Sequence, residues 1–144
     1  MGSKAVSIVS MLMRLFPIVL VALSFAAQDR SADSRAFVGH WKAVCADGKE
    51  FVLLDLVANG TGIGGTISLG NTGGEEGQCA YVVNPPNPQH AMKITDAAVK
   101  ESTLHFRGAG RMDFEMRLKN NDQAELKFMG TPVEDHPWVL RRAK

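Results

Sequence analysis

The chain has 144 residues, of which 45% are hydrophobic and 22% are charged, as in a single globular domain with little room for a second. The 16 Lys and Arg residues nearly balance the 15 Asp and Glu residues. This balance argues against a nucleic-acid-binding protein and against binding to anionic membranes, because both partners favour clustered basic residues.

Residues 1–27 have the composition of a secretory signal peptide. Lys4 and Arg14 supply positive charge, an apolar run follows, and small residues stand where cleavage is expected, at Ala26 or Ala27. The run is well short of the roughly 20 residues that a membrane-spanning helix needs. We therefore expect a cleaved signal peptide and a secreted or periplasmic protein.

The mature chain is predicted to start with a polar leader at residues 28–36, followed by one domain at residues 37–144. The leader is expected to be flexible or to form one short helical turn. Removal of the signal leaves 14 basic and 15 acidic residues, a net charge of −1, so no membrane attachment is expected after cleavage. Translation from Met11 or Met13 instead of Met1 would give a more compact signal.

Cys45 and Cys79 are the only cysteines, and both belong to the predicted mature chain. In an exported protein an even pair of cysteines indicates a disulfide. Closing a loop of this size would stabilise the fold by roughly 3–4 kcal/mol in the chain-entropy treatment. A redox role is disfavoured because the C-x-x-C spacing is absent.

Three strands joined by tight turns open the predicted domain. In the first, side chains alternate so that Trp41 and Cys45 share one face while Lys42 points the other way. The second is an almost continuous apolar run, typical of a strand covered on both faces. The predicted strands are residues 37–45, 50–58 and 63–69, with turn signals at Asp47-Gly48 and Asn59-Gly60.

The second half of the chain alternates short strands with turns. A Gly-rich acidic loop at residues 70–78 and a Pro-rich loop at residues 84–89 flank a short strand at residues 79–83. The clearest alternation places Met112, Phe114, Met116 and Leu118 on one face. Further strands are predicted at residues 92–94, 104–106, 112–118, 124–128 and 138–142, with a turn at residues 100–102 and a loop at residues 131–137.

About eight short strands with no helix pattern predict an all-β fold, either a barrel or a sandwich. We favour a single small antiparallel meander β-barrel, because a closed barrel has no exposed strand edges. Eight strands enclose a space that side chains fill or that holds one small ligand. The G-x-G-x-x-G pattern at residues 60–65 is followed by a predicted strand and not by the helix of a dinucleotide site.

Asp55 interrupts the second apolar run and shares its face with Phe51, Leu53 and Val57. We expect this face to point outward, because the opposite face is more apolar. If the face were buried, Asp55 would need a partner such as Arg111 or Arg117.

The sequence offers little for catalysis. No Ser lies in a G-x-S-x-G context, and no cysteine is free to act as a nucleophile. The histidines lack the paired spacing of a metal site; they are His40, His90, His105 and His136. We therefore expect a protein that is not an enzyme and holds no metal or cofactor.

The tripeptide Gly39-His40-Trp41 resembles the G-x-W start of the first strand in the calycins, the lipocalin and avidin-like barrels. In lipocalins that Trp closes the base of the barrel beneath an Arg from the end of the chain. The resemblance implies this role for Trp41, with Arg141 or Arg142 as its cation–π partner. It implies a calycin-like barrel.

The same G-x-W start, together with the size and a single disulfide, is similar to small periplasmic inhibitors of bacterial metalloproteases. In those inhibitors the N-terminal leader enters the protease cleft. The resemblance implies that residues 28–36 would act in this way on a secreted protease.

The function that the sequence favours is binding of a small, mostly apolar molecule within the barrel. Its contacts would be side chains expected to face inward, which could equally fill the core: Trp41, Tyr81, Phe106, Phe114, Met116 and Phe128. One alternative is a protease inhibitor acting through the leader. Another is a structural envelope protein that binds partners through the loops at residues 70–78 or 84–89. We expect a monomer with no nucleic-acid partner.

Overall fold

The computed structural model describes residues 33–75 and 78–144 of the chain. The predicted signal peptide and the first part of the leader, residues 28–32, lie outside this range. Residues 33–35 are helical. The strands are β1 (Gly39–Val44), β2 (Glu50–Asn59), β3 (Gly62–Leu69), β4 (Asn71–Gly73), β5 (Tyr81–Asn84), β6 (Met92–Lys93), β7 (Thr95–Lys100), β8 (Thr103–Arg107), β9 (Asp113–Leu118), β10 (Gln123–Phe128) and β11 (Trp138–Arg142).

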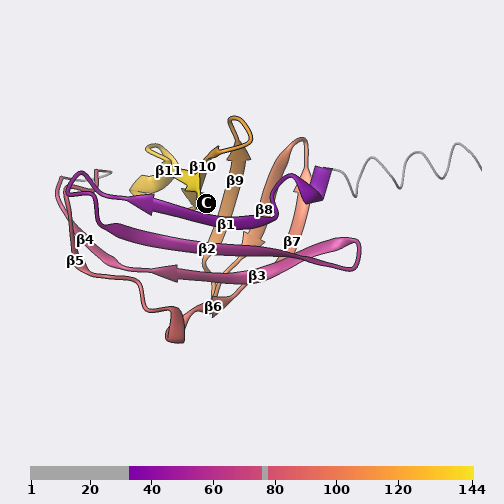
Figure 1. Cartoon of the computed structure of the whole chain (residues 1–144), viewed down its shortest axis with the longest axis horizontal. Helices are drawn as coiled ribbons and strands as arrows, with labels where there is room; N and C mark the ends of the chain where they lie inside the picture. The colour runs from indigo at the N-terminus through magenta and orange to yellow at the C-terminus, as the bar shows by residue number, and fades with distance from the viewer. Residues whose placement is uncertain (1–32, 76–77) are drawn as a thin grey trace, which may run out of the picture.

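Nine of these strands form one antiparallel sheet in the order β6-β3-β2-β1-β11-β10-β9-β8-β7, and β4 pairs with β5 in a separate two-stranded sheet. The sheet curls into a nearly closed barrel (Figure 1). Its two end strands, β6 and β7, follow each other directly in the chain. The joint between them is held to β3, because the Ile94 N–H donates to the Gly65 carbonyl at 3.0 Å. The all-β barrel prediction is therefore confirmed.

The turns follow the local chemistry of the sequence. Gly48 and Gly60 have φ values of 79° and 63°, the left-handed region that Asp-Gly and Asn-Gly turns require. Glu101 and Ser102 join β7 to β8 with φ values of 50° and 63°, although neither is a residue that favours this region. Two short 3₁₀ turns, η1 (Pro88–His90) and η2 (Pro132–Glu134), begin after Asn87 and Thr131, whose side chains cap them.

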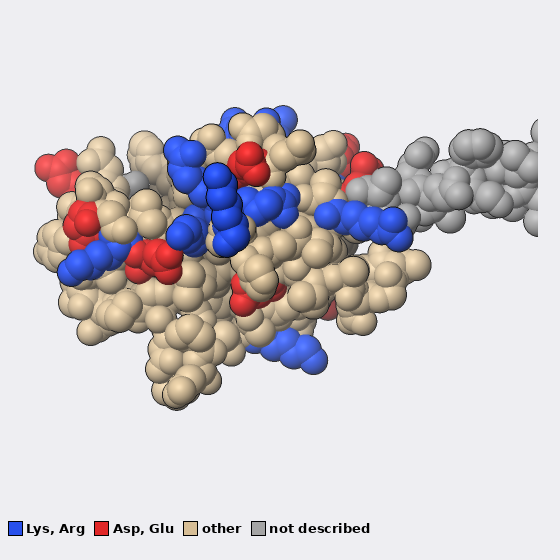
Figure 2. Space-filling view, in the orientation of Figure 1, with Lys and Arg blue, Asp and Glu red and all other residues tan. Residues whose placement is uncertain are grey.

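Side chains alternate between the two faces of each strand, and those on the inner face fill the barrel interior. The largest side chains with less than 2% exposure are Trp41, Phe114, Leu54, Leu56, Ile67, Leu104, Met116, Leu126, Leu140 and Val52. The outer face that Figure 2 shows carries charges of both signs, with Lys and Arg side chains gathered over β1 and β11. The described part of the chain has no helix that is long and apolar enough to cross a membrane.

Several details differ from the sequence-based expectation, among them strand β7, which was not predicted. The loop at residues 70–78 contains β4, and its partner β5 begins at Tyr81 and not at residue 79. Phe51, expected on the outer face beside Asp55, is only 4% exposed and packs edge-on against Trp138 at 5.3 Å. The register of the β1–β2 ladder shifts between Ala43 and Val44, and this bulge turns the start of β2 inward.

Candidate functional site

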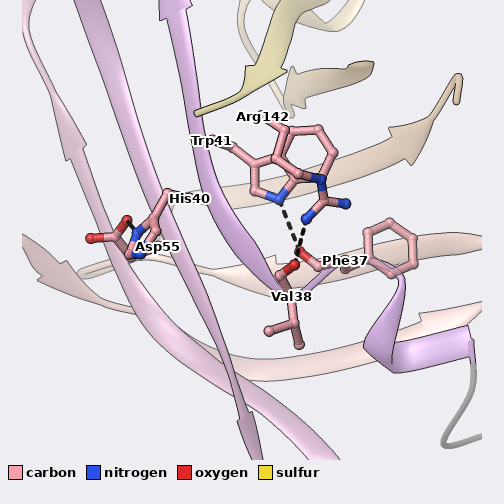
Figure 3. Close-up of polar contacts among 6 residues, drawn as sticks. All are labelled: Phe37, Val38, His40, Trp41, Asp55 and Arg142. Carbon is pink, nitrogen blue, oxygen red and sulfur yellow. Dashed lines mark hydrogen bonds and ion pairs between the residues drawn. The ribbon is translucent and has the colours of Figure 1, made fainter. Parts of the chain in front are cut away.

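Trp41 lies on the inner face of β1, in the interior of the barrel. Alternation along β1 turns its indole inward, where it is 1% exposed. The indole Nε1 donates a hydrogen bond of 2.9 Å to the Phe37 carbonyl, so the one polar atom of the ring is satisfied (Figure 3). The residues that precede β1 are thereby tied to its buried face.

Arg142, and not Arg141, covers the indole. Its guanidinium carbon lies 4.1 Å from the Trp41 ring centroid (Figure 3). Alternation explains the choice, because Leu140 and Arg142 point inward on β11 while Arg141 points out. The same guanidinium donates to three carbonyls: Ala36 at 2.9 Å, Val38 at 2.5 Å and Asn121 at 2.7 Å. It therefore joins the first and last strands at the base.

Gly39 makes this arrangement possible. Its φ of 142° is one that other residues rarely adopt, and a Cβ at this position would lie 2.5 Å from the Arg142 Nη1. Glycine is therefore needed at the first position of the Gly39-His40-Trp41 tripeptide for a steric reason.

His40 and Asp55 form an ion-pair contact on the outside of the barrel. The imidazole Nδ1 lies 2.5 Å from the Asp55 Oδ1, and the two side chains are 74% and 50% exposed (Figure 3). The expectation that Asp55 points outward is confirmed. The partners considered for a buried Asp55, Arg111 and Arg117, do not take that role, because His40 lies directly opposite in the β1–β2 ladder.

Four of the six residues proposed to contact a ligand are deeply buried. Trp41, Phe106, Phe114 and Met116 are 0–3% exposed, and Phe128 is partly buried against them. The phenyl rings stack on each other, with centroids 5.2 Å apart for Phe106–Phe114 and 4.7 Å apart for Phe114–Phe128. These residues lie as expected on the inner face, where they contact one another.

The inward placement predicted for Tyr81 is wrong. Its side chain is 53% exposed on β5, outside the barrel, and its ring lies over Gly73 of β4. Cys79 and Val82 both pack against the core although they are three residues apart, so the alternation expected from residue 79 to residue 83 breaks and Tyr81 points outward.

The small β4–β5 sheet is tied firmly to the barrel. The predicted disulfide between Cys45 and Cys79 is present. Next to it, the backbone N–H groups of Ala46 and Asp47 donate to the carbonyls of Cys79 and Ala80 at 3.0 and 3.1 Å. The β5 strand is thus attached to the end of the barrel at which β1 stops.

Asp47 completes this attachment in a way that the sequence did not reveal. Its two carboxylate oxygens accept hydrogen bonds from the backbone N–H groups of Lys49, at 2.9 Å, and Val82, at 3.0 Å. These two bonds, the first being the stronger cause, hold the pKa of Asp47 below its ordinary value of 3.8. The turn signal identified Asp47, but its bond to a residue 35 positions away had no local sequence signature.

One hollow lies outside the barrel core, between β3 and β7. It has a volume of about 340 Å³, and Leu104 and the first helical turn border it. Neither Trp41 nor Tyr81 lines it. Over residues 33–75 and 78–144, no group of three or more His, Cys, Asp or Glu side chains is arranged to hold a metal ion.

No family model, curated protein or solved structure matches this chain. The resemblances to calycins and to metalloprotease inhibitors therefore stay predictions.

Proposed function

We propose that this is an exported, non-enzymatic protein that binds a partner protein through the end of the barrel that carries β5. The observation that carries the proposal is the exposure of Tyr81 and Val83, at 53% and 58%, on one face of a strand that a disulfide fixes to the barrel. Exposed apolar side chains on a rigid support favour protein docking, because little conformational entropy is lost on binding.

Other exposed apolar residues support this location. Val44 ends β1 and is 47% exposed, and Val139 lies near the start of β11 and is 46% exposed. The end of β1, the start of β11 and the β4–β5 sheet lie at the same end of the barrel (Figure 1). The proposal keeps the predicted involvement of the loops at residues 70–78 and 84–89, which flank β5.

Site-specific cross-linking tests the proposal. A photoreactive amino acid would replace Tyr81 or Val83 in the mature protein, in the envelope fraction of the source cells. The control position is Val57, which is 51% exposed near the far end of β2. We expect one defined protein adduct from positions 81 and 83 that position 57 does not give. The same adducts from all three positions, or none, would reject the proposal.

A small apolar molecule is the second candidate partner, and the hollow between β3 and β7 favours it over the interior. The apolar lining includes Ile63, Val99 and Leu104, and about 340 Å³ is near the lower limit of ligand pockets. Thermal shifts against lipid and metabolite sets would test it, with Ala97→Phe as the variant that fills the hollow. A shift that this variant does not reduce would exclude the site.

The protease-inhibitor alternative rests on the leader, of which residues 28–32 lie outside the described structure. It is favoured by the hydrogen bonds of Arg142 to the Ala36 and Val38 carbonyls, which hold the C-terminal end of the leader against the barrel. Deletion of residues 28–32 keeps these contacts and should abolish inhibition of secreted metalloproteases. If the intact mature protein inhibits none of them, the alternative fails.

A further inference from the structure

The outer face of β1 and β11 combines two cations with two exposed valines. Lys42 and Arg141 lie directly opposite each other in the β1–β11 ladder. Val44 and Val139, two residues along each strand, point to the same side, because side chains alternate along a strand. We call these four residues the Arg141 face.

The cations of this region are not equally neutralised. The Lys42 ammonium lies 3.0 Å from a Glu50 oxygen, and the Lys119 ammonium lies 3.2 Å from a Glu125 oxygen. Arg141 has no carboxylate within ion-pair distance among residues 33–75 and 78–144. Its guanidinium is therefore the one cation of the three that lacks a described acidic partner.

Arg141 gives no evident help to the fold. Its direct neighbour in the ladder is Lys42, another cation, which holds Glu50 and offers Arg141 no ion pair. The stacking on Trp41 and the bonds to the base of the barrel belong to Arg142. An exposed charge that has no ion pair within the described residues is available for a contact outside the chain.

The surroundings indicate the chemistry of that contact. A guanidinium forms two parallel hydrogen bonds with a carboxylate, which gives geometry as well as charge. Lys42 and Lys119 already hold carboxylates, so these two lysines add little free charge to that of Arg141. The valines, 46–47% exposed, provide apolar area beside the charge.

We propose that Arg141 binds a carboxylate of a partner protein, an Asp or Glu flanked by apolar residues that pack on Val44 and Val139. The inference rests on the proposed protein-binding function and names the charge that the partner presents. It places the partner across the end of the barrel, over β11 as well as β5.

Peptide selection tests this inference. A displayed library of random 12-residue peptides would be selected on the mature protein, and the selected peptides measured against Arg141→Gln. We expect peptides with Asp or Glu between apolar residues. Binding should weaken about tenfold or more with Arg141→Gln, and equally when the acidic residue of the peptide becomes Asn or Gln. Lys119→Gln is the matched control and should change binding less than about twofold, because Glu125 already neutralises Lys119.

Weaker binding by Arg141→Gln would not result from unfolding, because the substitution removes an exposed charge and should keep or slightly raise the Tm. Selection of no peptide, or of peptides without acidic residues, would overturn the inference, as would equal binding by Arg141→Gln. Binding only to phosphatidylglycerol vesicles would also overturn it and assign the face to a membrane surface. If cross-linking at position 81 fails while acidic peptides still bind, only the β5 site is rejected. If cross-linking at position 81 succeeds while no acidic peptide binds, only the Arg141 face is rejected.

Discussion

At the scale of single residues, two neighbouring arginines have opposite roles because alternation along β11 points them to opposite faces. Arg142 lies on Trp41 and bonds three carbonyls at the base of the barrel. Arg141 is exposed beside Lys42. From the sequence, either Arg141 or Arg142 could be the partner of Trp41, because a shift of one residue in the register of β11 would exchange their faces.

Replacement of each arginine by lysine separates these roles. Arg142→Lys keeps the charge but loses the planar stack and most of the carbonyl bonds, so the free energy of unfolding should fall by about 1–3 kcal/mol. Arg141→Lys should change it by less than about 0.5 kcal/mol. Urea unfolding of both variants checks the difference. Equal effects would contradict the assignment of Arg142 to the base.

Asp47 should make stability depend on acidic pH. Because its pKa is lower in the folded state than its ordinary 3.8, its bonds to Lys49 and Val82 stabilise the fold above pH 3.8, and that contribution is lost as the pH falls through the lowered pKa. The free energy of unfolding of Asp47→Asn should therefore be lower than that of the wild type at pH 6, and the difference should shrink toward pH 2. Urea unfolding between pH 2 and 6 measures this. A constant difference across that range would contradict it, and Asp135→Asn serves as the exposed control.

At the scale of elements, the sequence predicted strands well where the turns are made by glycine. Asp47-Gly48 and Asn59-Gly60 marked both ends of β2 because their backbone conformation needs no distant partner. It predicted β4 and β5 poorly, because their pairing depends on the disulfide and on the Asp47 carboxylate rather than on local alternation. Tyr81 was misplaced for this reason.

Substitutions in the β7–β8 turn should raise the stability of the fold. Glu101 and Ser102 both have positive φ, as in a type I′ turn, which favours Asn-Gly. The double change Glu101→Asn and Ser102→Gly should raise the free energy of unfolding by about 0.5–1 kcal/mol, because it relieves an unfavourable backbone conformation. Thermal unfolding measures this against Lys100→Asn, a neighbouring change at a residue without positive φ. A loss of stability in the double variant would show that these side chains support the turn.

The disulfide should stabilise the whole domain and hold β5 in place. Its cysteines are 34 residues apart, and changing both to Ser should cost about 3–4 kcal/mol in the chain-entropy treatment. Amide hydrogen exchange should speed up most at β5, which the disulfide and Asp47 attach to the barrel. Unchanged exchange at β5 would mean that Asp47 and the neighbouring backbone bonds suffice to hold the strand.

At the scale of the whole molecule, the inner and outer faces of the barrel differ in how far the sequence predicts them. The inner face could be predicted from alternation, as for Phe114 and Met116, because burial of one strand face is a local property. The outer surface could not, because contacts such as His40 with Asp55, or Lys42 beside Arg141, depend on register between strands. The interior aromatic residues pack on one another, and the exposed apolar residues lie outside.

The central claim is therefore that binding belongs to the β5 end of the barrel and that the interior belongs to stability. It is tested most directly by measuring both affinity and Tm for two variants, with the partner obtained by cross-linking at position 81. Tyr81→Ser with Val83→Ser should weaken binding at least about tenfold at an unchanged Tm. Phe114→Leu should lower the Tm and leave the affinity unchanged. The reverse result, lost affinity from the interior change and none from the β5 changes, would contradict the claim.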